Sequence, residues 1–169
     1  MKVIAFIGVG SNINPEENIK KALAELEKYV EVLNVSTHYS TRAEMRPEQP
    51  CYINGVWKIL TDISAVELKY KVLKNIEYDL GRKREEDKYA SRKIDLDILL
   101  YGNNVINNDK LEIPDKNIYK RAFICIPMHE LESGLVLPDT NRSLSSVVRG
   151  FKNEKMTPLI DFTVKLKNR

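Results

Sequence analysis

The feature that restricts the fold most is the order in which the apolar pattern changes along the chain. Short apolar or alternating runs, which are typical of strands, cover residues 3–9, 31–41, 52–60 and 95–101. Two segments with apolar residues at helical spacing lie between them, at 15–30 and 64–80. The order strand, helix, strand, strand, helix, strand is that of the ferredoxin-like βαββαβ unit. We therefore predict an α+β fold whose antiparallel sheet has helices on one face.

Residues that favour helix ends support these boundaries. Asn14 with Glu17, and Ser64 with Glu67, have the spacing of capping boxes, and Gly81 is typical of a helix end. Beyond the fourth strand we expect a C-terminal extension with a turn at 102–103, strand pieces near Val105 and Leu111, and short helices near Ile118 and Leu144. Residues 165–169 are expected to be frayed.

Length and composition predict one globular domain that spans residues 1–169. Of these residues, 43% are apolar and 30% are charged. No run approaches the ~18 apolar residues of a membrane span, and a strand pattern begins almost at once, so we expect a cytoplasmic protein.

Cys51 and Cys125 lack metal-ligand spacing and are expected to be reduced thiols that fill apolar space. A net charge of +3 is too balanced to indicate nucleic-acid binding. We expect a monomer.

Two acidic residues on the fourth predicted strand are the first candidates for chemistry. Asp95 and Asp97 are two residues apart, so both side chains lie on one face, with Cα atoms ~6.6 Å apart. Carboxylates at this spacing suit a hard cation such as Mg²⁺, which commonly completes its ligands with substrate phosphates. Leu96, Ile98 and Leu100 are expected to face the core. The alternative is a pair of surface salt bridges at a strand start.

A dense group of cations precedes this acidic pair, in residues 82–92. Phosphoryl transfer needs such a combination, because cations stabilise the charge that builds on the phosphate oxygens while metal ions orient the reacting groups. A loop of this kind is also typical of a mobile lid. The alternative is a solvated charged run, in which Glu85, Glu86 and Asp87 dilute the positive charge. Glycine-rich nucleotide loops are absent from the sequence, so side chains have to build any phosphate site.

The segment from Lys88 to Leu99, with Arg92 followed by Asp95 and Asp97, resembles the signature of the 6-hydroxymethyl-7,8-dihydropterin pyrophosphokinases of folate biosynthesis. Other motifs of that family follow in order: Gly10-Ser11-Asn12, Tyr39-x-Thr41, Gln49-Pro50-x-Tyr52-x-Asn54, Glu77, Gly81-Arg82-x-Arg84, Tyr101-Gly102-Asn103, Pro114, Arg121-Ala122-Phe123 and Pro127. The resemblance covers about residues 3–140. It implies a ferredoxin-like fold and transfer of the pyrophosphoryl group of ATP to the pterin hydroxymethyl oxygen, with release of AMP.

The resemblance also implies roles for individual residues. Asp95 and Asp97 would hold two Mg²⁺ ions, and Asp97 would take the hydroxyl proton. Arg82 and Arg92 would act with Asp97 in catalysis as lid arginines. The residues implied in ATP binding are Glu77, Arg84, Arg92, Ile98, Lys116 and Arg121. For Glu77, two other interpretations remain open: an acid that orients Arg82 or Arg84, or an acid at the boundary of its helix.

The pterin would be bound by residues from several predicted elements. These are Gly10, Thr41, Arg42, Ala43, Tyr52, Asn54, Tyr89 and Phe123. Tyr52 and Phe123 would stack on the flat ring, and Asn54 and the backbone near Thr41 would bond its amide-like edge. Both aromatic residues are also compatible with plain packing roles, whereas asparagine is depleted in strands and so favours function at position 54.

Three positions depart from the family pattern. Asp115 stands where many members have histidine, Glu85 replaces a lysine of the lid, and the loop after Thr41 lacks Pro-x-Gly. These departures keep open an alternative, a catalytically weak or silent module that binds a metabolite. A third possibility, an RNA-binding sheet of the same topology, is disfavoured because the strands lack aromatic triplets and a basic face.

Overall fold

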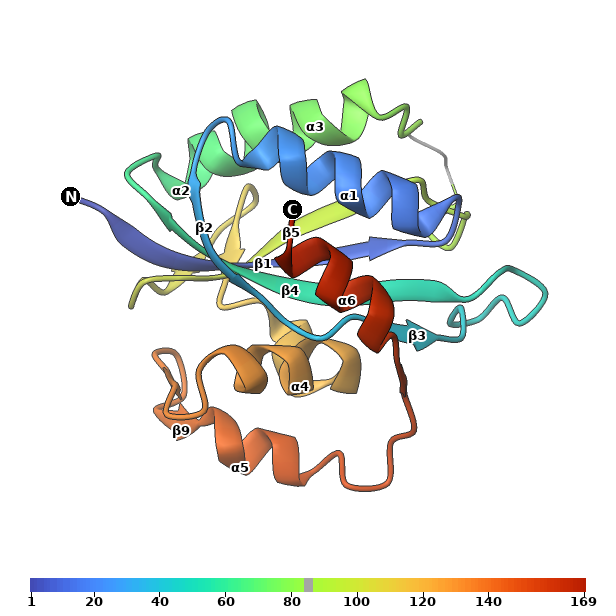
Figure 1. Ribbon diagram of the computed structural model, residues 1–169. Coiled ribbons are helices and arrows are strands. Elements are labelled where there is room, and N and C mark those ends of the chain that lie inside the picture. Colours follow the sequence, from blue (N-terminus) through green and yellow to red (C-terminus); the bar gives the residue numbers. More distant parts are fainter. Residues whose placement is uncertain (84–86) are drawn as a thin grey trace.

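The computed structural model describes residues 1–83 and 87–169, and these form an antiparallel sheet covered by helices on both faces (Figure 1). Within this described part, six strands make the sheet in the order β10-β3-β4-β1-β5, with β2 also paired to β4. The strands are β1 (Val3–Ser11), β2 (Glu31–Val35), β3 (Tyr39–Thr41), β4 (Tyr52–Thr61), β5 (Asp95–Tyr101) and β10 (Thr157–Pro158). The predicted strand at 31–41 is thus divided into β2 and β3.

The first face of the sheet carries the two helices of the predicted βαββαβ unit, which confirms the ferredoxin-like fold. One is α1 (Pro15–Leu26). The other consists of three consecutive segments: α2 (Ala65–Glu67), the π-helical η1 (Leu68–Leu73) and α3 (Lys74–Asp79). Both bury their apolar sides against β1, β4 and β5, in a core centred on Trp57, Ile7 and Leu23. The apolar periodicity of the sequence thus predicted the order of strands and helices in this unit.

The predicted helix ends are only partly confirmed. Ser64 caps the second helix, where its hydroxyl accepts a bond from the Glu67 amide at 3.3 Å, and Gly81 ends it with φ of 84°. Asn14 does precede α1, but its side chain makes no capping bond, because its backbone has the left-handed conformation. Both cysteines are free; Cys125 is buried as expected, whereas Cys51 is exposed and fills no core space.

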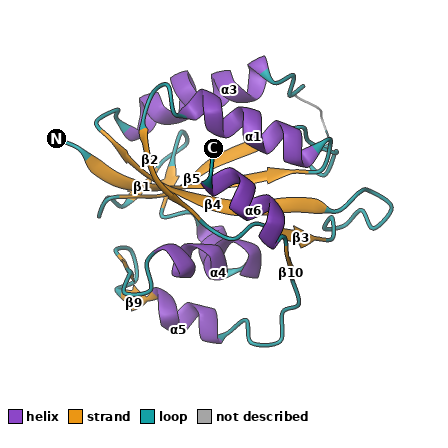
Figure 2. Ribbon diagram, viewed as in Figure 1, coloured by secondary structure: helices purple, strands orange, loops and turns teal. Residues whose placement is uncertain are grey.

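The C-terminal extension covers the opposite face (Figure 2). It contains η2 (Lys116–Tyr119), α4 (Ala122–Leu131) and α5 (Leu144–Arg149), with a small hairpin of β8 (Val136–Leu137) and β9 (Arg142–Ser143). A second hairpin, β6 (Ile106–Asn107) with β7 (Glu112–Ile113), instead packs in the first core, where Tyr70 of η1 donates to the Lys110 carbonyl. The helices near Ile118 and Leu144 and the strand pieces are therefore confirmed, while α4 was not predicted. A second core, with Phe6, Val56 and Met128, joins this layer to the sheet.

The last segment returns to the first face as α6 (Ile160–Lys167). Phe162 and Leu166 are buried in the same core as α1, and the Arg169 guanidinium donates to Glu27 on the chain that follows α1. The prediction that residues 165–169 are frayed is therefore wrong, because apolar burial and an ion pair hold this end. Across the described ranges, no helix is both long and apolar enough to cross a membrane.

A bulge in β5 sets which core receives the last apolar side chains of the strand. The pairing of β1 with β5 shifts between Phe6 and Ile7, so that Leu99 has no partner on β1. Leu96 and Ile98 consequently pack in the first core, whereas Leu99 and Leu100 both belong to the second. Leu100 is buried as predicted, but in the second core, because one inserted residue turns the rest of a strand over.

Candidate active site

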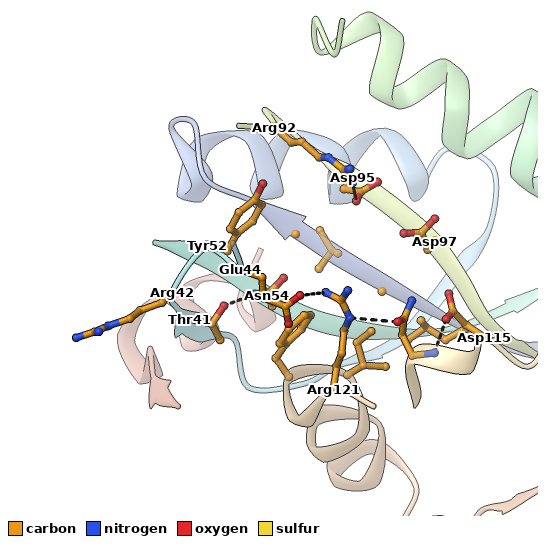
Figure 3. A pocket seen from close by; sticks show the side chains of 18 of the residues that line it. Thr41, Arg42, Glu44, Tyr52, Asn54, Arg92, Asp95, Asp97, Asp115 and Arg121 are labelled. Atoms are coloured by element: carbon orange, nitrogen blue, oxygen red, sulfur yellow. Dashed lines mark hydrogen bonds and ion pairs between the residues drawn. The ribbon is translucent and has the colours of Figure 1, made fainter. Parts of the chain in front are cut away.

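A cavity of about 340 Å³ opens where the ends of β1, β4 and β5 meet the start of α4 (Figure 3). The loop after β3, the segment before β5 and η2 complete its walls. Of the predicted site residues, those that line it are Gly10, Thr41, Arg42, Tyr52, Asn54, Tyr89, Arg92, Asp95, Asp97, Arg121 and Phe123. Residues from widely separated parts of the sequence thus meet at one place, as the resemblance implies.

The acidic pair and the two arginines come together at the edge strand β5. Asp95 accepts a bond from Arg82 Nη1 at 2.7 Å with Oδ1, and its Oδ2 is paired with Arg92. Arg92 is held further by a bond from its Nη2 to the Lys88 carbonyl, at 2.7 Å. Asp97 makes no hydrogen bond or ion pair with any residue that the structure describes, and its side chain is open to the cavity. One carboxylate is therefore neutralised and the other is available.

The surroundings of Asp97 disfavour its negative charge. Loss of hydration raises the pKa of Asp97 to about 7, and the neighbouring charge of Asp95 adds to the effect. The carboxylates of Asp115 and Glu77 act in the same direction, while Lys74 opposes them. A group with this pKa is well placed to exchange a proton near neutral pH, and a cation placed beside it would favour the ionised form.

The donor set fits a magnesium ion that shares its ligands with a phosphate. Asp95 and Asp97 offer oxygen donors on one face of β5, as predicted. Among the residues that the structure describes, no cluster of three or more potential ligands occurs. Mg²⁺ commonly takes one or two carboxylates and completes its shell with water and substrate phosphates, so two aspartates suffice.

Glu77 lies beneath Arg82 rather than in this cavity. It is 2% exposed, accepts a bond from the Leu96 amide at 2.8 Å, and pairs with Arg82 and Lys74. Burial raises the pKa of Glu77, and the Leu96 amide together with the Arg82 charge opposes that rise. Of the interpretations left open, the structure favours the one in which Glu77 orients Arg82. It also fixes β5 at the start of the acidic pair.

The other end of the cavity contains the residues expected to bind the pterin. Asn54 donates to the Thr41 hydroxyl at 2.7 Å, across the pairing of β4 with β3. A Cβ at position 10 would lie 2.8 Å from Asn54 Oδ1, so only glycine there leaves room for this side chain. The half-buried Tyr52 lies beside them. Asn54 and its neighbours thus form a preformed polar patch in the cavity wall.

Six predicted residues either do not line the cavity or point away from it: Glu77 and Arg82, described above, and four others. The guanidinium of Arg42 extends away from the other labelled side chains in Figure 3. Ala43 is a buried residue of the loop after β3, Ile98 is buried in the first core, and Lys116 is exposed and paired with Glu112. Arg84, together with Glu85, lies outside the described residues.

Arg121 is held by two residues that no sequence pattern had singled out. Arg121 Nε donates to Asn117 Oδ1 at 3.1 Å, and its Nη1 lies 2.9 Å from Glu44 Oε2 (Figure 3). The backbone N–H of Asn117 in turn donates to Asp115 Oδ1 at 2.7 Å, so Asp115 acts here as the N-terminal cap of η2. Glu44 and Arg121 meet only in the folded chain, and no local sequence pattern predicts the contact.

A ferredoxin-like sheet that presents a carboxylate pair and two guanidinium groups to one cavity is typical of enzymes that transfer phosphoryl groups from a nucleotide. Comparison with known proteins narrows this class. Residues 6–133 match the sequence model of 7,8-dihydro-6-hydroxymethylpterin-pyrophosphokinase. The chain belongs to this family.

Individual relatives agree with the family match. The chain is 36% identical over 160 residues to the 2-amino-4-hydroxy-6-hydroxymethyldihydropteridine pyrophosphokinase of Haemophilus influenzae, across 93% of this chain and 98% of that protein. The protein of the same name from Aquifex aeolicus is 36% identical over 134 residues, which are 79% and 82% of the two chains. The folic acid synthesis protein fol1 of Pneumocystis carinii is 32% identical over 167 residues, but this chain spans only 22% of its length.

Solved structures support the fold alone. HPPK-DHPS of Plasmodium falciparum matches with a TM-score of 0.72 at 14% sequence identity, over 89% of this chain and 45% of that chain.

Proposed function

We propose that this protein transfers the pyrophosphoryl group of ATP to the hydroxymethyl oxygen of 6-hydroxymethyl-7,8-dihydropterin and releases AMP. The observation that carries the proposal is the cavity in which Asp97, beside the Arg82–Asp95–Arg92 cluster, faces the polar patch around Asn54. The end of the cavity near Asp97 suits a magnesium nucleotide, and the end near Asn54 suits a flat, polar ring. Membership of the pyrophosphokinase family supports the same reaction.

The acidic pair serves the metal and the proton. Asp95 and Asp97 would hold two Mg²⁺ ions, which would supply positive charge that offsets the negative charge of the nucleotide phosphates. In the reaction the hydroxymethyl oxygen bonds to the β-phosphorus, and the bond from that phosphorus to the oxygen it shares with the α-phosphate breaks. AMP leaves with the electron pair. The Asp97 carboxylate, which a neighbouring cation would keep ionised, takes the hydroxyl proton.

The arginines stabilise the group in transfer. Arg82 is held by Glu77 and Asp95, so its guanidinium keeps one orientation, and Arg92 is fixed by Asp95 and the Lys88 carbonyl. Positioned cations of this kind act on charge that develops in the transition state. We assign Arg121 to the ATP phosphates, along with Arg84. Lys116 and Ile98 are left out of the proposed site, because Lys116 is paired with Glu112 and Ile98 is buried in the first core.

The pterin is assigned to the end of the cavity near β3 and α4. Tyr52 and Phe123 stack on the ring, because flat heterocycles pack on aromatic faces. Asn54, with the Thr41 hydroxyl already oriented toward it, bonds the amide-like edge of the ring together with the backbone of residues 41–43. Tyr89 covers the ring from the segment before β5. The proposal also includes a single-domain, cytoplasmic monomer without a nucleic-acid partner, which the free cysteines and the near-balanced charge support.

The test is a nucleotide analysis of the complete reaction. The protein is incubated with ATP, Mg²⁺ and the hydroxymethyl-dihydropterin, and the nucleotides are resolved. We expect AMP and the pterin diphosphate in equal amounts, and no AMP when the pterin is omitted. Formation of ADP would mean transfer of a single phosphoryl group, and no turnover with retained pterin binding would favour the silent binding module.

A variant pair then tests the role of Asp97. Asp97→Asn should abolish turnover while pterin affinity changes little, because the amide neither holds Mg²⁺ well nor accepts the proton. Asp161→Asn, which removes the same charge from the exposed first turn of α6, is the matched control and should keep the rate of the unaltered protein. Turnover retained by Asp97→Asn would remove Asp97 from its role.

A further inference from the structure

Two polar residues at the end of β1 have no part in the proposed reaction. Ser11 and Asn12 are 0% and 2% exposed, and neither lines the cavity, although Gly10 before them does. Burying a polar side chain costs free energy unless its donors and acceptors are satisfied. The partners of Asn12 therefore indicate what this side chain does.

Asn12 binds both backbone polar groups of Arg92. The Asn12 N–H donates to the Arg92 carbonyl at 3.0 Å, and Asn12 Oδ1 accepts from the Arg92 N–H at 2.7 Å. Next to these bonds, the Ser11 hydroxyl donates to the Lys93 carbonyl. The end of β1 thus holds the backbone of Arg92 from two directions.

The side-chain amide of Asn12 has only one possible orientation. Its Nδ2 lies 3.4 Å from the Pro50 carbonyl oxygen, 3.4 Å from Gln49 Oε1 and 3.2 Å from Ser91 Oγ. The Pro50 carbonyl can only accept and the Arg92 N–H can only donate, so Nδ2 must face Pro50 and Oδ1 must face Arg92. The acceptor for Arg92 is thus held in place by the other bonds of the same amide.

Arg92 depends on these bonds because no regular element holds its backbone. Residues 87–94 form neither helix nor strand, and the ladder between β1 and β5 ends at the pair of Gly10 and Asp95. At the far end of the side chain, the guanidinium pairs with Asp95 and donates to the Lys88 carbonyl (Figure 3). A shift of the Arg92 backbone would displace this group, and a displacement of ~1 Å can cost about 10²-fold in rate.

We propose that Asn12 is a positioning residue for the transfer step, because it fixes the backbone of Arg92 and so keeps the guanidinium in place beside Asp95. The inference rests on the proposed function, in which Arg92 stabilises the charge that develops on the group in transfer. Asn12 itself is buried outside the cavity and touches neither substrate. Its loss should therefore slow transfer and leave substrate affinity almost unchanged.

Single-turnover kinetics measure the transfer step apart from product release. Protein in excess over ATP is mixed with Mg²⁺ and the hydroxymethyl-dihydropterin, and AMP is measured over time. Asn12→Ala should lower the rate constant by about 10- to 100-fold. The Kd for α,β-methylene-ATP with Mg²⁺, measured by calorimetry, should change by less than about twofold, because the lost interaction acts only in the transition state.

Two further variants guard against a general effect on folding. Asn12→Ser keeps a polar group but is too short to reach the Arg92 N–H, so it should slow transfer as Asn12→Ala does. Asn18→Ala is the matched control, since Asn18 is 8% exposed on α1 and donates to the Ile13 carbonyl at 2.6 Å. It removes a similarly buried amide whose bond lies elsewhere, and it should keep the transfer rate.

The same substitution in an Arg92→Ala background decides whether Asn12 acts through Arg92. There Asn12→Ala should lower the rate further by less than about twofold, because the side chain that it positions is absent. An equal loss in both backgrounds, or a large loss of nucleotide affinity, would refute the inference. If Arg92→Ala slows transfer but neither substitution of Asn12 does, only the positioning role is refuted. If Arg92→Ala itself leaves the rate unchanged, the role of Arg92 in the proposed function is wrong.

Discussion

Acidification from pH 7.5 to pH 5.0 should destabilise the fold through His38, which is completely buried next to β4. Its Nδ1 is 3.0 Å from the Ser36 carbonyl oxygen, and its Nε2 is 3.3 Å from Trp57 Nε1. The indole nitrogen can only donate, so Nε2 must accept and the ring is neutral, with its proton on Nδ1. A second proton, on Nε2, would point at the indole N–H of Trp57, and neither of these two donors would then have an acceptor.

The size of the effect follows from the pKa of His38. Burial lowers this pKa from an ordinary value of 6.5 to about 4, the bond to the Ser36 carbonyl opposes the shift, and the charge of Lys167 adds to it. The unfolded chain takes up the proton below pH 6.5, whereas the folded chain does so only below about pH 4. The contribution to stability is therefore complete above pH 6.5 and declines by about 1.4 kcal/mol per pH unit below it. At pH 5.0 the loss is about 2 kcal/mol.

Urea unfolding at the two pH values measures this loss. Trp57, the single tryptophan, is buried beside His38 and reports unfolding by fluorescence. We compare the unaltered protein with His38→Gln, whose amide can accept from the indole and donate to the Ser36 carbonyl. His129→Gln, at a partly exposed histidine bonded to Ser145, is the matched control.

The unaltered protein and the His129→Gln control should each lose about 2 kcal/mol more on acidification than His38→Gln does. If His38→Gln loses as much stability as the unaltered protein, the reasoning about the buried ring is refuted.

Three further substitutions test other parts of the structure. Gly55→Ala would place a Cβ 2.6 Å from the buried ring of His38, so we expect a loss of about 1–3 kcal/mol in thermal melting, and an unchanged melting temperature would contradict the packing described here. Arg92→Ala should lower the turnover rate by about 10²-fold, measured as AMP release, and an unchanged rate would leave Arg92 without a role in the transition state. Leu166→Ala, at a site 1% exposed, should cost about 2–5 kcal/mol in urea unfolding, whereas Val164→Ala, on the exposed side of α6, should cost little; equal losses would argue against the docking of α6.

The parts of the fold that the sequence predicted are those with a clear local period. Alternation and helical spacing placed β1, α1, β4 and β5, because a half-buried strand and a one-sided helix impose these periods directly. The helix α4 was missed because its residues are apolar on almost every side and include Pro127, so no polar face marks it. The bulge at Leu99 was missed because a strand pattern does not record where its partner shifts register.

Part of the candidate site could likewise be predicted from short sequence segments, and part could not. The spacing of Asp95 and Asp97 and the run of cations before them are properties of a short segment, and the structure brings Arg82 and Arg92 to Asp95. The roles of Asn117 and Glu44 are different, because each depends on the place to which another element carries Arg121.

By itself the sequence determined the order of the elements and the chemistry of the acidic strand, since both depend only on which residue types occur at fixed, short spacings. Only the tertiary structure decided that Glu77 is buried beneath Arg82, that the C-terminal helix α6 closes the first core, and that Glu44 meets Arg121 over the cavity. The physical reason is that burial and ion pairing depend on distances between elements. Those distances are set when the apolar faces of the whole chain pack together, and no local period encodes them.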